Sequence, residues 1–258
     1  MTRPDGSLPK PARVGQPRDA LFTEPSKRLA DFDFGPETVA VFDDMVDRSV
    51  PFYREIQRMM AELVRDFAAE DTTVYDLGCA TGTTLLQIAQ ALPADRRVRL
   101  VGIDNSPEML ELAKEKLTAA DVKQPFELHY GDLNQVTPIA NASVVLMALT
   151  LQFVRPLYRQ QLIRTVRDGL TENGCLILVE KVLGENSTYN RLFIKYYYDM
   201  KKRNGYSDSE ITHKREALEN VLVPYRLEEN KELLRSEGFR HVDVFFKWFN
   251  FCAIVAMR

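Results

Sequence analysis

The sequence has little cysteine, little histidine and no long hydrophobic run. Its three cysteines are widely spaced and odd in number, a pattern that fits neither a disulfide framework nor a zinc site of paired cysteines. The longest apolar stretch, residues 144–151, is interrupted by Thr150 and is too short to span a bilayer. The first residues contain no apolar segment of the secretory type. We therefore expect a cytoplasmic protein without a membrane partner.

The chain also lacks an excess of basic residues. It has 34 Lys and Arg against 37 Asp and Glu, a formal net charge of −3. Proteins whose main task is to bind nucleic acid usually carry a basic excess, so we expect no direct nucleic-acid partner. The length of 258 residues and a hydrophobic content of 45% are ordinary for a globular protein and suit an α/β domain with an appendage, or two small domains.

The first part of the chain divides into a tail and a helical lead-in. Residues 1–19 contain four prolines and two glycines, with few large apolar groups. Such a segment cannot bury enough surface to offset its ordering entropy, so we expect a disordered tail. Helical spacing of apolar residues begins at Pro36 and predicts a lead-in over 36–69, with a second helix beginning at Pro51. Residues 20–258 are then a single domain.

Beyond the lead-in, apolar strands alternate with helical patterns, which indicates a mostly parallel sheet with helices on both faces. The predicted strands are 73–77, 99–103, 126–130, 143–149 and 175–179, and the predicted helices between them are 83–92, 107–119 and 156–170. After residue 181 we predict helices at 190–203, 208–220 and 227–237, followed by strands at 242–249 and 251–257.

The segment Asp76-Leu-Gly-Cys-Ala-Thr-Gly82 follows the first predicted strand and opens a helix. Small residues at Gly78, Cys79 and Ala80 let the backbone turn sharply and approach a ligand closely. The second glycine comes four residues after the first, so the segment is not the dinucleotide motif. It resembles the S-adenosylmethionine (SAM) motif D-x-G-x-G-x-G, with Ala80 at the middle glycine. The alternative is merely a tight turn between strand and helix.

Two further acids follow strands in the order that SAM enzymes use. Asp104, followed by Asn105, ends the second strand, where a carboxylate accepts hydrogen bonds from ribose hydroxyls. Helix capping by Ser106 is the plainer interpretation of that segment, and both can hold together. Asp132, followed by Leu133, comes after the third strand, where an acid often binds the adenine amino group; alone it would be a turn residue. The three motifs together predict SAM binding.

The helical segment 187–226 has eight basic and five acidic residues and many aromatic ones. Basic and aromatic groups together can bind nucleic acid or an anionic aromatic metabolite. The alternative is a solvated charged face and a packed aromatic face of one helix. Among the three histidines, none stands out as a general base, and the sequence shows no metal-ligand pattern.

Several specific stretches carry a resemblance to a known family. Residues 48–53 read RSVPFY, residues 202–207 read KRNGYS and residues 218–221 read LENV. With the SAM motifs, they resemble the carboxy-S-adenosyl-L-methionine (carboxy-SAM) synthase family, from about Asp19 to the C-terminus. The resemblance implies a class I SAM-methyltransferase fold, Rossmann-like, with a seven-stranded sheet whose last strand is antiparallel.

The resemblance also implies the reaction and the roles of individual residues. Members of the family take the carboxyl group of prephenate, convert SAM to carboxy-SAM and release phenylpyruvate, and a second enzyme uses carboxy-SAM to modify the wobble uridine of certain tRNAs. Tyr53 and Arg215 take catalytic positions, with Arg215 reaching the carboxylate from the neighbouring subunit of a homodimer. The cofactor-binding positions are Tyr53, Gly78, Cys79, Ala80, Asp104, Asn105, Asp132, Leu133 and Arg215.

The chain departs from the family pattern at two places near the cofactor. Ala148 stands where the family usually has asparagine, and the loop between Asp132 and Asn141 is one residue longer. These departures leave a conventional SAM-dependent small-molecule methyltransferase as an alternative. A third interpretation is a catalytically silent SAM-binding protein that docks tRNA or another enzyme through residues 187–226.

Overall fold

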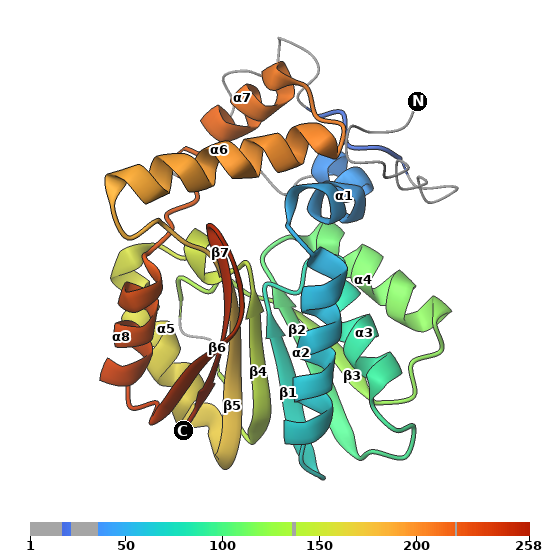
Figure 1. Ribbon diagram of the computed structural model, residues 1–258. Helices are drawn as coiled ribbons and strands as arrows, with labels where there is room; N and C mark the ends of the chain where they lie inside the picture. Colours follow the sequence, from blue (N-terminus) through green and yellow to red (C-terminus); the bar gives the residue numbers. More distant parts are fainter. Residues whose placement is uncertain (1–16, 22–35, 136–137, 220) are drawn as a thin grey trace.

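A seven-stranded sheet lies at the centre of the computed structural model, which describes residues 17–21, 36–135, 138–219 and 221–258 (Figure 1). The strand order is β3-β2-β1-β4-β5-β7-β6. All neighbouring strands pair in parallel except β7, which is antiparallel to both β5 and β6. This confirms the predicted α/β sheet with its antiparallel last strand. The strands are β1 (Thr72–Leu77), β2 (Val98–Asp104), β3 (Phe126–Tyr130), β4 (Ala142–Ala148), β5 (Leu170–Lys181), β6 (His241–Trp248) and β7 (Phe251–Met257).

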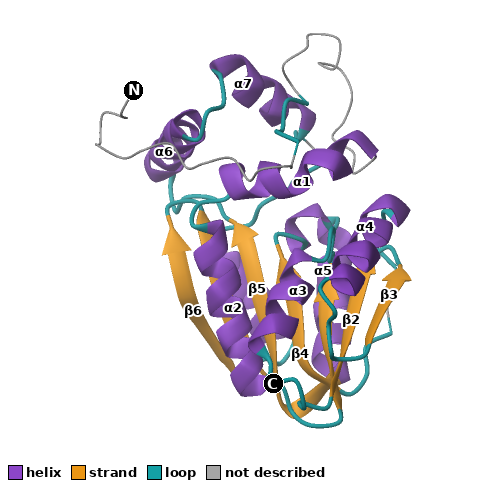
Figure 2. Ribbon diagram, turned by 90° about the vertical axis from the view of Figure 1, so that its right-hand side faces the viewer, coloured by secondary structure: helices purple, strands orange, loops and turns teal. Residues whose placement is uncertain are grey.

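Helices cover both faces of the sheet, as Figures 1 and 2 show. On one face lie α2 (Tyr53–Phe67), α3 (Thr83–Ala91) and α4 (Pro107–Ala119), which bury Val64, Leu85 and Leu117 in one core cluster. On the other lie α5 (Pro156–Gly169) and α8 (Leu227–Ser236), which bury Ile163 and Leu234 in a second. Because helices cover both faces, the central strand β4 is apolar almost throughout.

Three helices lie beyond the edge of the sheet where the parallel strands end. They are α1 (Pro36–Ser49), α6 (Ser187–Arg203) and α7 (Asp208–Ala217), which group above the sheet in both views. A short 3-10 helix, Leu151–Phe153, follows β4 on the same edge. Ligands bind at this edge in open α/β sheets, so these helices enclose the expected site.

Several predicted boundaries differ from the structure; the predicted helix 208–220, for example, ends at Ala217, followed by a turn. The second helix begins at Tyr53 and not at Pro51, because Phe52 adopts a left-handed conformation with φ 53°. β5 begins at Leu170, well before the predicted residue 175, because its first residue pairs with Ala142 ahead of a register shift. Residues 1–16 of the predicted disordered tail lie outside the described residues. Asp19, the last residue assigned to that tail, is buried and belongs to the packed part of the chain.

Candidate active site

The turn between β1 and α3, residues 78–82, forms a tight backbone cradle at the carboxyl end of β1. Gly78 and Gly82 adopt left-handed conformations with φ 76° and φ 71°, which glycine tolerates and most residues do not. A Cβ atom on Gly78 would lie 2.5 Å from the Thr150 side chain, so no larger residue fits there. α3 begins at Thr83, and the free N–H groups of its first turn face the same edge of the sheet.

Asp104 lies at the end of β2 and organises two neighbouring turns. Its Oδ2 accepts a hydrogen bond from the Ala80 backbone N–H at 2.9 Å, and its Oδ1 accepts one from the Ser106 N–H at 3.0 Å. Burial raises the pKa of this carboxyl, although the backbone donors act in the opposite direction. The Ser106 hydroxyl caps α4 by accepting from the Met109 N–H at 3.2 Å. The capping role and the placement of Asp104 at the site are therefore both present.

Asp132 follows β3 at the adjoining corner of the site. Its Oδ1 accepts hydrogen bonds from the backbone N–H of Asn134 at 2.9 Å and from the Asn134 side chain at 2.8 Å. The backbone donor is the main cause of the lowered pKa of Asp132, so the side chain remains a charged acceptor. Leu133, next in the chain, is buried beneath this corner.

A cavity of about 250 Å³ joins these elements. It brings together eight of the nine predicted binding residues: Tyr53, Gly78, Cys79, Ala80, Asp104, Asn105, Asp132 and Leu133. Arg215 does not line this cavity; it lies exposed on α7, with Glu216 at 3.8 Å. Burial, with the nearby charges of Asp43 and Asp76, raises the pKa of Tyr53, so its phenol stays protonated and can donate a hydrogen bond.

Helix α1 covers the cavity and is fastened to the cradle by an ion pair. The Lys116 ammonium on α4 lies 2.8 Å from Asp43 Oδ2 on α1. The same ammonium donates to the Thr81 hydroxyl at 2.9 Å and to the Thr83 hydroxyl at 2.8 Å. Burial opposes ionisation of Asp43, but Lys116 and the two hydroxyls lower its pKa overall. Phe42 of α1 lines the cavity beside this pair.

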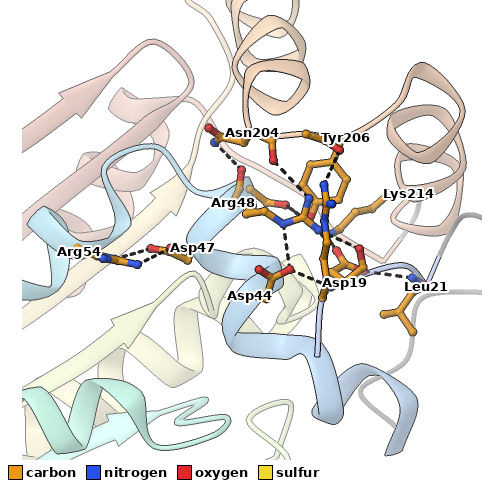
Figure 3. Close-up of polar contacts among 12 residues, drawn as sticks. Asp19, Leu21, Asp44, Asp47, Arg48, Arg54, Asn204, Tyr206 and Lys214 are labelled. Atoms are coloured by element: carbon orange, nitrogen blue, oxygen red, sulfur yellow. Dashed lines mark hydrogen bonds and ion pairs between the residues drawn. The ribbon is translucent and has the colours of Figure 1, made fainter. Parts of the chain in front are cut away.

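A second polar network connects α1 with α6 and α7 (Figure 3). The Arg48 guanidinium lies over the Tyr206 ring, 4.1 Å from its centroid, and pairs with Asp44 at 2.9 Å. The Tyr206 hydroxyl donates to Asp19 Oδ2 at 2.5 Å. Lys214, which lines the cavity, lies 3.6 Å from the same carboxylate oxygen. Asp19 therefore joins Tyr206 and Lys214 behind the cavity wall.

The sequence motifs did not identify every residue of the cavity wall. Lys181, at the end of β5, and Lys214, on α7, both line it. Lys214 belongs to the basic and aromatic segment 187–226, whereas no sequence motif pointed to Lys181. Ala148, at the end of β4, also lines the cavity and presents only a methyl group. The loop between Asp132 and Asn141, which we expect to be one residue longer than in the family, includes residues 136–137, which lie outside the described residues.

Asp76 lies at the end of β1, directly beneath the cradle. It is 1% exposed, and within the described part of the chain neither of its carboxylate oxygens has a hydrogen-bond partner. Burial, followed by the charge of Asp104, raises its pKa to about 7. The described residues contain no cluster of three or more His, Cys, Asp or Glu side chains that could hold a metal ion, and no helix long and apolar enough to cross a membrane.

Comparison with known proteins identifies the family. The family model described as "Methyltransferase domain" matches residues 74–174, from β1 into β5. The carboxy-S-adenosyl-L-methionine synthase of Methylococcus capsulatus is 58% identical over 241 residues, covering 93% of this chain and 99% of that protein. The chain belongs to the carboxy-SAM synthase family. A second member, from Nautilia profundicola, is 39% identical over 240 residues, which cover 93% of this chain and 99% of the relative.

The family relationship accounts for the SAM motifs and for the fold. A SAM-dependent methyltransferase from Aquifex aeolicus superposes with a TM-score of 0.58 at 17% identity, covering 87% of this chain and 99% of that one. At this identity the likeness concerns the fold alone. The carboxy-SAM synthase family therefore shares its architecture with methyltransferases, and the chemistry depends on residues within the cavity.

Proposed function

We propose that the protein is a carboxy-SAM synthase that transfers the carboxyl group of prephenate to SAM and releases phenylpyruvate. The product supplies a second enzyme, which modifies the wobble uridine of tRNA to 5-carboxymethoxyuridine. The observation that carries the proposal is full-length identity of 58% to a carboxy-SAM synthase, together with a SAM cradle that opens into a cavity with basic residues. Both substrates are small molecules, so this activity requires no contact with RNA.

The roles proposed for the cradle follow from its geometry. Asp104 would accept hydrogen bonds from the ribose hydroxyls, with Asn105 at the adjoining groups, while Asp132 and Leu133 would hold the adenine. The backbone of Gly78, Cys79 and Ala80 would pass beside the methionine part of SAM. Each of these residues lines the same cavity, at the carboxyl ends of β1 and β2 and beyond β3.

The reaction needs a carbanion and a source of carbon dioxide. The methyl carbon of SAM is acidic because it adjoins a sulfonium, and it loses a proton before it forms a C–C bond to carbon dioxide. The ring carboxylate of prephenate supplies that carbon dioxide when its C–C bond breaks, and the electron pair enters the ring. The ring becomes aromatic as its hydroxyl leaves and takes the proton of the methyl group. The products are carboxy-SAM, phenylpyruvate and water.

Two side chains are proposed to hold the new carboxylate. Tyr53 lines the cavity with a protonated phenol, a suitable hydrogen-bond donor to an anion. Arg215 would pair with the carboxylate through its planar guanidinium, from the second subunit of a homodimer. Lysine cannot form that two-point contact, so Arg215→Lys is expected to be nearly as impaired as Arg215→Ala.

The direct test is incubation of the purified protein with SAM and prephenate, followed by mass spectrometry of the nucleosides. We expect a species heavier than SAM by one carbon dioxide, formed only when prephenate is present, and phenylpyruvate in equal amount. SAM without prephenate is the control and should remain unconverted. Formation of S-adenosylhomocysteine, with no carboxylated species, would refute the proposal.

One observation favours a second candidate function, a conventional small-molecule methyltransferase. Ala148 lines the cavity with a methyl group where the family usually has an asparagine, so one polar contact to the ligand is missing. Transfer of labelled methyl groups from SAM to an extract of small metabolites, independent of prephenate, would support this candidate. Ala148→Asn then offers a discriminating variant, because it should raise carboxy-SAM formation if the proposed function holds.

A further inference from the structure

Three lysines and two tyrosines alternate beside the cavity, between the end of β5, α6 and α7, and three of the five, Lys181, Tyr197 and Lys214, line it. The Lys181 and Lys201 ammonium groups lie 4.9 Å and 5.8 Å from the centroid of the Tyr197 ring. Lys201 also lies 4.8 Å from the centroid of the Tyr206 ring, and Lys214 lies 5.6 Å from the same centroid. We call Lys181, Lys201 and Lys214 the lysine group.

The lysine group has more ammonium groups than paired carboxylates within the described residues, and burial lowers the pKa of Lys181 and Lys214 to about 8 and that of Lys201 to about 7, so a bound anion would favour their charged forms. Asp19 is the carboxylate paired with Lys214, whereas Lys181 and Lys201 form no ion pair within the described part of the chain. The nearby Arg48 is already paired with Asp44. Lys201 is buried, at 3% exposure, and burying an unpaired ammonium group is costly; Lys214 is buried at 5% exposure with only the Asp19 contact. Such an arrangement is typical of a site that receives an anion.

Two members of the group can reach a ligand. Lys181 and Lys214 line the cavity together with Ser49, Tyr197 and Phe251, whereas Lys201 does not line it. The Ser49 hydroxyl accepts a hydrogen bond from Lys214 at 3.4 Å. Tyr197 packs on Phe251 with ring centroids 5.4 Å apart, so an aromatic wall adjoins the two ammonium groups. This part of the wall can bind a ligand that carries a carboxylate on a ring, with the ammonium groups at the carboxylate and the aromatic side chains at the ring.

We propose that Lys181 and Lys214 bind the carboxylate that the donor retains, while Lys201 adds positive potential from behind Tyr197. This inference rests on the proposed function. Prephenate has two carboxylates, and only the ring carboxylate departs as neutral carbon dioxide. A cation paired with the departing group would stabilise its charge and oppose its loss. The lysine pair is therefore suited to the carboxylate of the side chain, which holds the ring while its other carboxylate faces the SAM methyl group.

Phenylpyruvate separates the two carboxylates experimentally, because it keeps only the retained one. We expect calorimetric titration to show that Lys181→Met and Lys214→Met each raise the Kd for phenylpyruvate by about 10- to 100-fold, the range for a hydrogen bond to a charged group. The Kd for SAM should stay within about twofold of wild type. Lys195→Met, an exposed lysine on α6 away from the cavity, is the matched control and should bind both ligands normally.

A second measurement does not depend on the folding of any variant. The methyl ester of phenylpyruvate has the same ring without the charge, and wild-type protein should bind it about 10- to 100-fold more weakly than the acid. Equal binding of acid and ester, or wild-type affinity for phenylpyruvate in both lysine variants, would overturn the inference. The proposed function fails separately, if wild-type protein with SAM and prephenate forms no carboxy-SAM.

Discussion

Asp76, beside the SAM cradle, is a buried carboxyl group whose ionisation lowers the stability of the folded protein. Its carboxyl group is buried at the end of β1 without a hydrogen-bond partner among the described residues, and Asp104 follows the neighbouring strand β2. Burial and the charge of Asp104 raise its pKa to about 7, against about 3.9 for an unfolded chain. The folded protein therefore keeps this proton across a pH range in which the unfolded chain has lost it.

The sign of the effect on stability follows from proton binding. Between pH 4 and pH 7 the folded state binds one proton more than the unfolded state at this group. The free energy of unfolding therefore falls as pH rises, and Asp76 contributes about 1.4 kcal/mol for each pH unit. Above pH 7 both states are ionised and the contribution is constant. Asp76→Asn should remove this slope and leave the protein more stable than wild type at pH 8, by up to about 4 kcal/mol.

Urea unfolding at pH 5, 6, 7 and 8 measures this difference. Glu232→Gln, an exposed change on α8, serves as the surface control and should follow the wild-type curve. Asp104 and Glu180 also have raised pKa values, and burial is the main cause for both, so the Asp76→Asn variant keeps the part of the slope that these two groups contribute. Parallel curves for wild type and Asp76→Asn would contradict the prediction.

At the scale of elements, α1, which covers the cavity and which we call the roof of the site, is held by contacts with segments that are far apart from it in sequence. Lys116 of α4 pairs with Asp43 of α1 and donates to both Thr81 and Thr83, so the ion pair connects roof and cradle. Its side chains are about 20% exposed, which reduces but does not abolish its strength. Loss of the pair should loosen α1 over the cavity and weaken SAM binding.

A double-mutant cycle isolates this pair. Lys116→Met and Asp43→Asn should each lower the free energy of unfolding, and the double variant should lose less than their sum, with a coupling of about 1 kcal/mol. The SAM Kd, measured by calorimetry for all four proteins, should rise about three- to tenfold in each single variant. If the losses in unfolding free energy are additive and the SAM Kd does not change, the ion pair does not hold α1 over the cavity.

Elements and local motifs could be predicted from the sequence, but contacts between distant segments could not. The segment Asp76–Gly82 and the acid Asp104 lie at the ends of strands and in the turns that follow them, where periodicity and residue type are sufficient. Lys181 and Lys214 line one cavity only because of the tertiary fold: the basic segment 187–226 indicated Lys214, but nothing in the sequence placed it on the same cavity as Lys181. Asp19 was assigned to the tail because its partner Tyr206 is 187 residues away.

At the scale of the whole molecule, Arg215 is the one predicted site residue that does not line the cavity of its own chain. It lies exposed on α7, whereas the adjacent Lys214 is buried and lines the cavity. The Lys214 side chain therefore lies at the cavity of its own chain, and the Arg215 side chain lies at the protein surface. The proposed function needs Arg215 at the carboxylate. A second copy of the chain would meet this need by placing its own Arg215 at the cavity.

Mixed dimers test whether Arg215 acts across subunits. Arg215→Ala and Asp104→Ala should each abolish carboxy-SAM formation alone, since one lacks the arginine and the other the ribose contact. Coexpressed in equal amounts, they form mixed dimers in which one site combines an intact Asp104 with the partner's intact arginine. Random pairing then restores about one quarter of wild-type activity. An arginine that acts within its own chain predicts no recovery, because every site in the mixture lacks one of the two residues.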